Sequence, residues 1–368
     1  MAAYWRDRFQ IAPKRGRLLR HSDINSVDRV HCPGQQFDLD RVIVPFHADE
    51  INNPQRGSLF VRARIAEEFG EIDLFGMSSP ITSDRYFFGR ERLVQELVVR
   101  ATTQAQNSGL FGLRKTGKTS VVRAFERRVD HQSVLTEYID CHNPGIHAAR
   151  WWQVLENIVE RLHKKLTTNY KRTARLLLDY SDQNCGTRFS SDIQTLLTQG
   201  ELSRIVLLLD EIEYITPSLS GALGKHWDQD FLPFWQTIRA THHETQGQLL
   251  FIVAGVNPAA VENTSFDNLP NPIFQLAPPT YLEPFDRESE PFDRESVRQM
   301  TRTLGRYSGM RFDESVYDYL TEQFGGHPFL VRIACSEVWQ TKNMNDPQEL
   351  VSVDIGISEG LWMRYVSD

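Results

Sequence analysis

The residues whose types and spacing could do chemistry begin with an octapeptide rich in glycine, lysine and threonine. Residues 112–119 read Gly-Leu-Arg-Lys-Thr-Gly-Lys-Thr, the pattern of a phosphate-binding loop. The octapeptide lies between an apolar stretch ending Gly109-Leu110-Phe111 and a helix-like run at 120–126. In this setting the backbone N–H groups surround a phosphate chain at a helix N-terminus, where the helix dipole favours an anion. The octapeptide therefore predicts that the chain binds ATP or GTP.

Single positions of this loop have separate predicted roles. Lys118 is expected to reach the β- and γ-phosphates and to stabilise charge there, and the Thr119 hydroxyl is expected to hold Mg²⁺. The residues predicted to contact the nucleotide from this segment are Gly112, Thr116, Gly117, Lys118, Thr119 and Ser120.

A second motif supplies two carboxylates. Residues 204–211 read Arg-Ile-Val-Leu-Leu-Leu-Asp-Glu, and an apolar run ended by acids is typical of a buried strand in a parallel sheet. Carboxyl ends of such strands face the ligand crevice. We therefore expect Asp210 to hold Mg²⁺ through water and Glu211 to polarise the attacking water. The alternative, a strand that simply ends in solvated charge, is the weaker interpretation beside the phosphate-binding loop.

A third buried strand is predicted at residues 248–258, with Asn257 at its carboxyl end. Asn257 could contact the γ-phosphate or the attacking water and so distinguish ATP from ADP. The competing interpretation is an Asn-Pro turn that only stops the strand. We favour the sensor.

Other patterns complete an alternating order of strands and helices. A strand is predicted at 134–140 by its alternation, a helix at 151–166, an amphipathic stretch around 227–235 and a last strand at 272–277. The apolar face predicted for the helix at 151–166 consists of Trp152, Leu155, Ile158, Val159 and Leu162. The aromatic residues at 227–235 fit a helix packed on the sheet better than a platform for stacking bases. This order predicts an α/β fold with a parallel sheet between helices.

Composition limits the class of protein. The 368 residues exceed one ordinary domain, and 40% hydrophobic and 24% charged residues are usual for a globular chain with a sizeable core. The net charge of −7 argues against a surface that coats nucleic acid. No stretch approaches the roughly 20 apolar residues of a membrane span, and no secretory signal is visible. The four cysteines form no close pair, so we expect a reduced, cytoplasmic protein without a zinc site.

Two further elements carry a family resemblance. Residues 86–91 read Tyr-Phe-Phe-Gly-Arg-Glu ahead of an amphipathic helix at 92–100, and residues 324–330 read Phe-Gly-Gly-His-Pro-Phe-Leu. With the loop and the acidic strand between them, they resemble the entry motif and the lid motif of STAND NTPases, which are related to AAA+ ATPases. This resemblance implies ATP or ADP with Mg²⁺ rather than GTP. It also implies that Phe87, Phe88 and Pro328 line the base.

The same resemblance implies a division of the chain. We expect an N-terminal appendage of unknown role at 1–75, a P-loop ATPase core at 76–280, a small helical lid at 281–345 and a tail at 346–368. Residues 1–21 carry six basic residues against one acid, so contact with nucleic acid or an acidic partner is possible. The sequence Glu-Pro-Phe-Asp-Arg-Glu-Ser occurs in tandem at 283–296, and its role stays open.

These features lead to one main hypothesis and two rivals. The main hypothesis is a bacterial signalling or defence ATPase of the STAND type, slow or stimulated by a partner, whose nucleotide state controls self-assembly or a separate effector protein. One rival is an AAA+ ATPase associated with nucleic acid, such as an initiator-like loader or a transposition regulator. The other rival is a scaffold that holds ADP permanently. The sequence identifies no activating signal, no oligomer number and no arginine that completes the site.

Overall fold

The computed structural model of the chain describes residues 73–76, 79–222, 224–282, 294–308 and 310–341. A five-stranded parallel sheet, in the order β2-β3-β4-β1-β7, forms its core. The strands are β1 (Ser108–Gly112), β2 (Val134–Asp140), β3 (Arg204–Asp210), β4 (Leu249–Gly255) and β7 (Pro279–Leu282). Because the strands are parallel, their carboxyl ends meet at one edge of the sheet. The predicted α/β class is confirmed.

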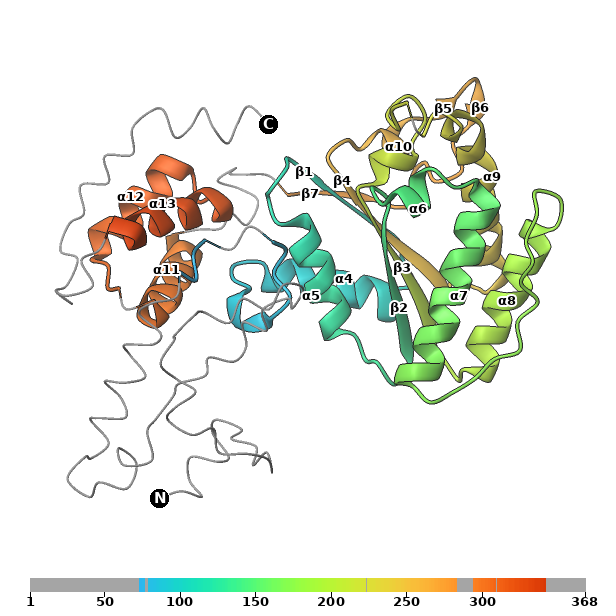
Figure 1. Cartoon of the computed structure of the whole chain (residues 1–368), viewed down its shortest axis with the longest axis horizontal. Helices are drawn as coiled ribbons and strands as arrows, with labels where there is room; N and C mark the ends of the chain where they lie inside the picture. The colour runs from blue at the N-terminus through green and yellow to red at the C-terminus, as the bar shows by residue number, and fades with distance from the viewer. Residues whose placement is uncertain (1–72, 77–78, 223, 283–293, 309, 342–368) are drawn as a thin grey trace, which may run out of the picture. The chain divides into compact units, whose positions relative to one another are not determined.

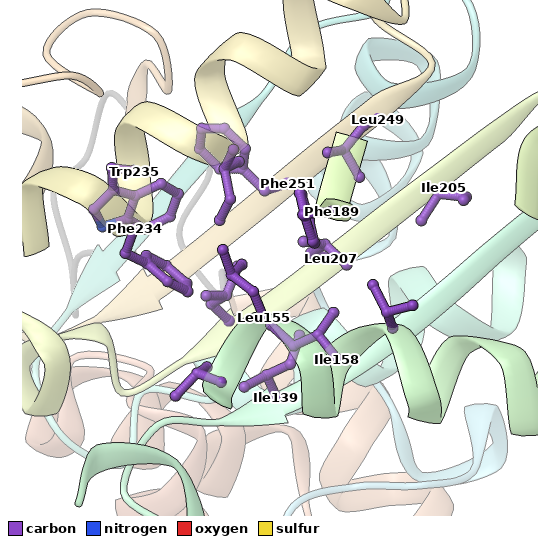
Figure 2. Close-up of a cluster of buried hydrophobic side chains, with 14 of the residues drawn as sticks. Ile139, Leu155, Ile158, Phe189, Ile205, Leu207, Phe234, Trp235, Leu249 and Phe251 are labelled. Carbon is purple, nitrogen blue, oxygen red and sulfur yellow. The ribbon is translucent and has the colours of Figure 1, made fainter. Parts of the chain in front are cut away.

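Helices cover both faces of this sheet (Figure 1). One face carries α4 (Glu91–Thr102) and α5 (Lys118–Arg128), and the other carries α7 (Trp151–Asn169), α8 (Cys185–Gln199) and α9 (Trp227–Glu244). Successive residues of β3 belong alternately to the two apolar layers, since side chains alternate between the two faces of a strand. Ile205 and Leu207 belong to the layer beneath α7, α8 and α9, which Figure 2 shows, whereas Val206 belongs to the layer beneath α4 and α5. A strand buried on both faces explains the continuous apolar run at 205–209.

The sequence predictions for these elements differ in accuracy. The strand predicted at 134–140 has the bounds of β2, whereas the last strand predicted at 272–277 is wrong. Residues 272–276 form turns, and the strand beside β1 is β7, which starts at a proline. The apolar face predicted for 151–166 is confirmed at Leu155, Ile158, Val159 and Leu162. Its first member is wrong, because Trp151 is buried in the core and Trp152 only packs against it. The aromatic side chains of α9 are fully buried, as expected for a helix packed on the sheet.

A second group of helices follows the sheet. It consists of α11 (Arg294–Tyr307), α12 (Glu314–Phe324) and α13 (Pro328–Thr341), which pack on one another. The segment 73–76 is attached to them, because the Arg332 guanidinium donates to the Leu74 carbonyl at 2.9 Å and the Ser336 hydroxyl donates to Asp73. Residues 73–75, which the sequence predicts to belong to the N-terminal appendage, therefore contact the helices of the predicted lid.

Short elements connect the larger ones. They are η2 (Asp84–Tyr86), α6 (Pro144–His147), η3 (Ile212–Ile215), α10 (Ala259–Glu262), β5 (Ser265–Phe266) and β6 (Leu269–Pro270). The basic arm at 1–21, the first repeat copy at 283–289 and the tail at 346–368 lie outside the described residues. Among the helices that the structure describes, none has the length and apolar character to cross a membrane.

Candidate functional site

The phosphate-binding loop links β1 to α5, as its sequence predicts. Gly117 precedes the first residue of α5 with φ of 92°, a left-handed conformation that disfavours side chains. A Cβ atom at this position would meet nothing within 4 Å, so the backbone conformation, not space, calls for glycine. The first turn of α5 holds no acidic residue. Its N–H groups therefore offer the unopposed positive end of a helix to an anion.

The Lys118 side chain is buried against the backbone of the phosphate-binding loop. Its Nζ donates to the carbonyl oxygens of Gly112 at 2.8 Å and Leu113 at 2.7 Å, and only 8% of the residue is exposed. The Thr116 hydroxyl donates to the same Leu113 carbonyl at 2.8 Å and so closes the loop. Burial lowers the pKa of Lys118, while the nearby carboxylates of Asp210 and Glu213 act in the opposite direction. Since an ammonium group has three donors, one remains to meet a phosphate.

Asp210 lies beside this lysine at the end of β3, and it is 2% exposed. Its Oδ2 accepts from the Thr119 hydroxyl at 2.6 Å, and its Oδ1 accepts from the Glu211 backbone N–H at 3.0 Å. A hydroxyl and a carboxylate at this separation are the oxygen donors that Mg²⁺ prefers. The residues predicted to hold the metal, Thr119 and Asp210, are thus in direct contact and fit that ion.

Glu211 has a strained backbone and an open side chain. Its φ of 53° and ψ of 48° are left-handed, which is uncommon for a residue with a side chain and is typical of functional positions. The side chain is 47% exposed, and one carboxylate oxygen lies 3.5 Å from His142 Nδ1. Burial and then the charge of Asp210 raise the pKa of Glu211, whereas His142 lowers it. A carboxylate with a raised pKa next to the metal-binding pair suits the polarisation of water.

Asn257 lies beyond the end of β4 and is exposed. Its Oδ1 accepts from the Ala259 backbone N–H at 2.9 Å, next to the start of α10, so part of the side chain serves a turn. Its Nδ2 makes no hydrogen bond within the residues described. The amide can therefore cap the turn and still offer two donors to a phosphate or a water molecule. The geometry is compatible with both interpretations of the sequence.

Glu213 is a third carboxylate near Lys118, and it was not predicted from the sequence. Both of its carboxylate oxygens lie 3.3 Å from the Val256 backbone N–H, which joins η3 to the end of β4. The contact depends on Gly255, because a Cβ there would lie 2.4 Å from a Glu213 oxygen. The sequence Asp-Glu-Ile-Glu could have indicated a third carboxylate at the site. Its partner at the end of β4, however, can be identified only when the order of the strands is known.

Tyr138 on β2 was also missed as a site residue. Its hydroxyl donates to Asp210 Oδ2 at 2.9 Å. Burial, followed by the neighbouring Asp210 charge, raises the pKa of Tyr138 far above its usual range. Tyr138 therefore acts as a proton-bearing donor to the carboxylate.

The entry motif packs against α4 and α5, and the lid motif joins α12 to α13. Phe87 is buried between α4 and α5, with the Arg128 guanidinium 5.5 Å from its ring centroid, and Phe88 is half-buried. Pro328 starts α13 and is half-buried too. Ser120 binds the entry segment, because its hydroxyl accepts from the Ile81 backbone N–H at 3.1 Å. Contact of these residues with a base or a phosphate stays a prediction.

One contact and one electrostatic influence connect the start of α13 with the loop and the entry motif. The Lys115 ammonium of the loop lies 4.5 Å from the centroid of the Phe329 ring. Burial and the positive charge of Arg90, a residue of the entry motif, lower the pKa of His327 to about 4. Of the two residues that flank Pro328, Phe329 therefore contacts the loop, and His327 is within the electrostatic influence of Arg90.

Comparison with known proteins agrees with this geometry. Residues 101–258, from the end of α4 to just beyond β4, match the family model of an AAA domain. No curated protein matches the sequence. Together with the loop geometry, this match identifies residues 101–258 as a P-loop ATPase domain of the AAA type.

Solved structures with a similar chain path include a Walker-type ATPase of Pyrococcus abyssi, at 16% identity and a TM-score of 0.48, covering 74% of each chain. The Orc1 protein of Aeropyrum pernix, solved in complex with DNA, has 15% identity and a TM-score of 0.41 over 76% of this chain and 65% of its own. The Drosophila origin recognition complex bound to DNA has 17% identity and a TM-score of 0.41, over 68% and 61%.

Proposed function

We propose that this ATPase is a molecular switch of the STAND type. ATP or ADP with Mg²⁺ binds between the sheet edge and the helices α11 to α13, and the presence of the γ-phosphate changes how α13 contacts the loop. The change alters self-assembly or the activation of a separate effector protein.

The observation that carries this proposal is the start of α13. Its flanking residues His327 and Phe329 interact with Arg90 and Lys115, which belong to the two segments predicted to hold base and phosphate. A nucleotide can shift a conformational equilibrium only through different affinities for the two states. A lid helix that begins against the phosphate-binding loop has the contacts that such a difference requires.

The chain's own residues divide the reaction among them. Lys118 and the N-terminus of α5 bind the phosphates, Thr119 and Asp210 would hold Mg²⁺, and Glu211 orients the attacking water. Mg²⁺, when bound, supplies charge neutralisation on the phosphate oxygens. The sequence motifs assign no arginine to the transferred phosphate. We therefore expect slow hydrolysis, since a supplied arginine is typically worth ~10³–10⁵ in rate.

The biological setting follows from the family resemblance. We propose bacterial defence or signalling in the cytoplasm as the setting. Cys141, Cys185 and Cys335 support a reducing compartment, because each is a buried free thiol.

Particle mass measured by light scattering tests the switch. The protein is measured with ADP, with ATP, and with ATP on the Glu211→Gln variant, which should retain ATP longer. Assembly that requires ATP and increases in the variant supports self-assembly as the output. A mass that does not depend on nucleotide excludes self-assembly as the output of the switch, and an effector protein or nucleic acid would then be the partner.

One observation favours the rival, an ATPase that acts on nucleic acid. Helix α11 carries arginines at every fourth position, 294, 298, 302 and 306, so they share one face of the helix. Arg294 and Arg298 pair with Glu314, whereas Arg302 and Arg306 are exposed and have no ion pair within the described residues. This rival predicts DNA binding that weakens steeply with salt and weakens further in Arg302→Gln/Arg306→Gln. Binding that is absent at low salt eliminates it.

A further inference from the structure

Tyr138 is fixed at three points on β2, the edge strand next to β3. The Arg123 guanidinium from α5 lies 3.5 Å from its ring centroid, and Arg161 from α7 donates to its backbone carbonyl at 2.6 Å. The third point is the hydroxyl, which donates to Asp210 Oδ2 at 2.9 Å. A side chain held at its ring and its backbone presents the hydroxyl in one place.

The strand register explains why the hydroxyl reaches Asp210. Tyr138 lies opposite Leu208, so Asp210 is two residues further along β3 and points to the same face. Diagonal neighbours of this kind are within reach of an aromatic side chain. Thr119, the other donor to the same oxygen, comes from the P-loop helix. Asp210 is therefore oriented from both neighbouring elements.

A buried carboxylate needs this support, because an ionised group removed from water is costly unless it accepts hydrogen bonds. Asp210 accepts from the Thr119 hydroxyl, the Tyr138 hydroxyl and the Glu211 N–H. Thr119 is itself expected to contact the metal, and the Glu211 N–H belongs to the adjoining backbone. Tyr138 is the donor in this set whose hydroxyl serves only to orient the carboxylate.

We propose that Tyr138 is a positioning residue for the magnesium site, and that its hydroxyl holds the Asp210 carboxylate in the orientation that serves a Mg²⁺–nucleotide complex. The proposal rests on the proposed function in that nucleotide must bind with Mg²⁺ at this loop. Partners that orient a metal-binding group typically contribute 10–100-fold to metal affinity. The expected effect is thus in the Mg²⁺ dependence of binding, not in nucleotide binding as such.

The test titrates a fluorescent ADP analogue in EDTA and in excess Mg²⁺, and the ratio of the two affinities is the Mg²⁺ contribution. Tyr138→Phe keeps the ring and the backbone and removes only the hydroxyl. We expect the ratio to fall about tenfold, with affinity in EDTA unchanged within about twofold. Tyr170→Phe is the matched control, because the Tyr170 hydroxyl donates to the Val134 carbonyl at the other end of the same strand. Its ratio should equal that of the unmodified protein.

A double-mutant cycle with Asp210→Asn tests the proposal in a second way. If Tyr138 acts through Asp210, Tyr138→Phe should cause no further loss of Mg²⁺ dependence in the Asp210→Asn background. An unchanged ratio in Tyr138→Phe, an equal loss of affinity in EDTA and in Mg²⁺, or a variant that does not fold would each overturn the proposal. An unmodified protein that binds no nucleotide in either condition would instead refute the proposed function.

Discussion

Two halves of the site differ in how firmly they are held. In the half that binds phosphate and metal, Lys118 and Asp210 are buried and each makes at least two hydrogen bonds. In the half formed by the residues that follow β3 and β4, Glu211 has a side chain that is 47% exposed, and Asn257 is exposed. Under the proposed function, this contrast predicts that the binding groups are oriented before the nucleotide arrives, whereas the groups proposed to respond to the γ-phosphate can move.

The physical reason is the cost of moving buried polar groups. A buried carboxylate or ammonium that leaves its hydrogen-bond partners pays the desolvation cost of an unsatisfied charge. An exposed carboxylate exchanges its partners for water at little cost. We therefore propose that the firmly held half binds the nucleotide and that the loosely held half responds to the γ-phosphate. Each variant below tests one part of this proposal.

The largest effect is expected in the firmly held half. Lys118→Met removes a buried cation and should weaken nucleotide binding by about 100-fold or more, because losing one partner of a buried charge pair costs roughly 2–5 kcal/mol. Calorimetric titration with ADP measures it. Lys115→Met, in the same loop, is the matched control and should change affinity less than about tenfold. Equal losses in both variants would contradict the difference between the halves.

In the loosely held half, Glu211→Gln should slow hydrolysis about 10²-fold or more while ATP affinity changes little, because a general base contributes typically 10²–10⁴. Single-turnover hydrolysis and equilibrium binding separate the two quantities. Glu213→Gln, which keeps an oxygen to accept from the Val256 N–H, should slow hydrolysis less than about tenfold. Unchanged hydrolysis in Glu211→Gln would support the permanent ADP scaffold.

A smaller effect is expected at the contact between Lys115 of the loop and Phe329 of α13. Phe329→Ala removes the aromatic ring beneath Lys115, and a cation–π contact is worth about 0.5–2 kcal/mol. The dissociation rate of ATP, measured by displacement of a fluorescent analogue, should rise a few-fold. Combined with Lys115→Met, the change should not increase further. Additive effects would show that the two side chains do not act together.

The smallest effects sharpen the role of Asn257. Asn257→Asp keeps the acceptor for the Ala259 N–H and removes the amide donors, so thermal stability should stay and hydrolysis should fall about tenfold. Asn257→Ala removes both and should also cost ~1 kcal/mol of stability, as for a lost cap. If Asn257→Asp hydrolyses ATP at the normal rate, the side chain only stops the strand.

The sequence predicted the parts of the fold that depend on one segment at a time. Runs such as 204–210 are apolar on both faces and end in acids, so the strand and its functional end follow from the pattern alone. Helix α8 was not predicted, although its buried residues Phe189, Ile193 and Leu196 lie at the spacing of one helical face. β7 was missed because Pro279 starts it, and a proline argues against a strand until the edge position is known.

The candidate site shows the same limit. Lys118, Thr119 and Asp210 could be named because each belongs to a local motif, and the structure joins Thr119 to Asp210 by a hydrogen bond. Tyr138 and Glu213 act across strands, and such pairs depend on strand order and register, which no single segment encodes. Side chains that orient the motif residues therefore required the structure.

The most direct test of the two-half account is hydrogen exchange in the Glu211→Gln variant with ADP and with ATP. The account predicts that the loop at 112–119 and β3 are protected equally by both nucleotides, whereas exchange in α13 changes only with ATP. Exchange in α13 that is the same with ADP and ATP would contradict it, because the lid would then not respond to the γ-phosphate.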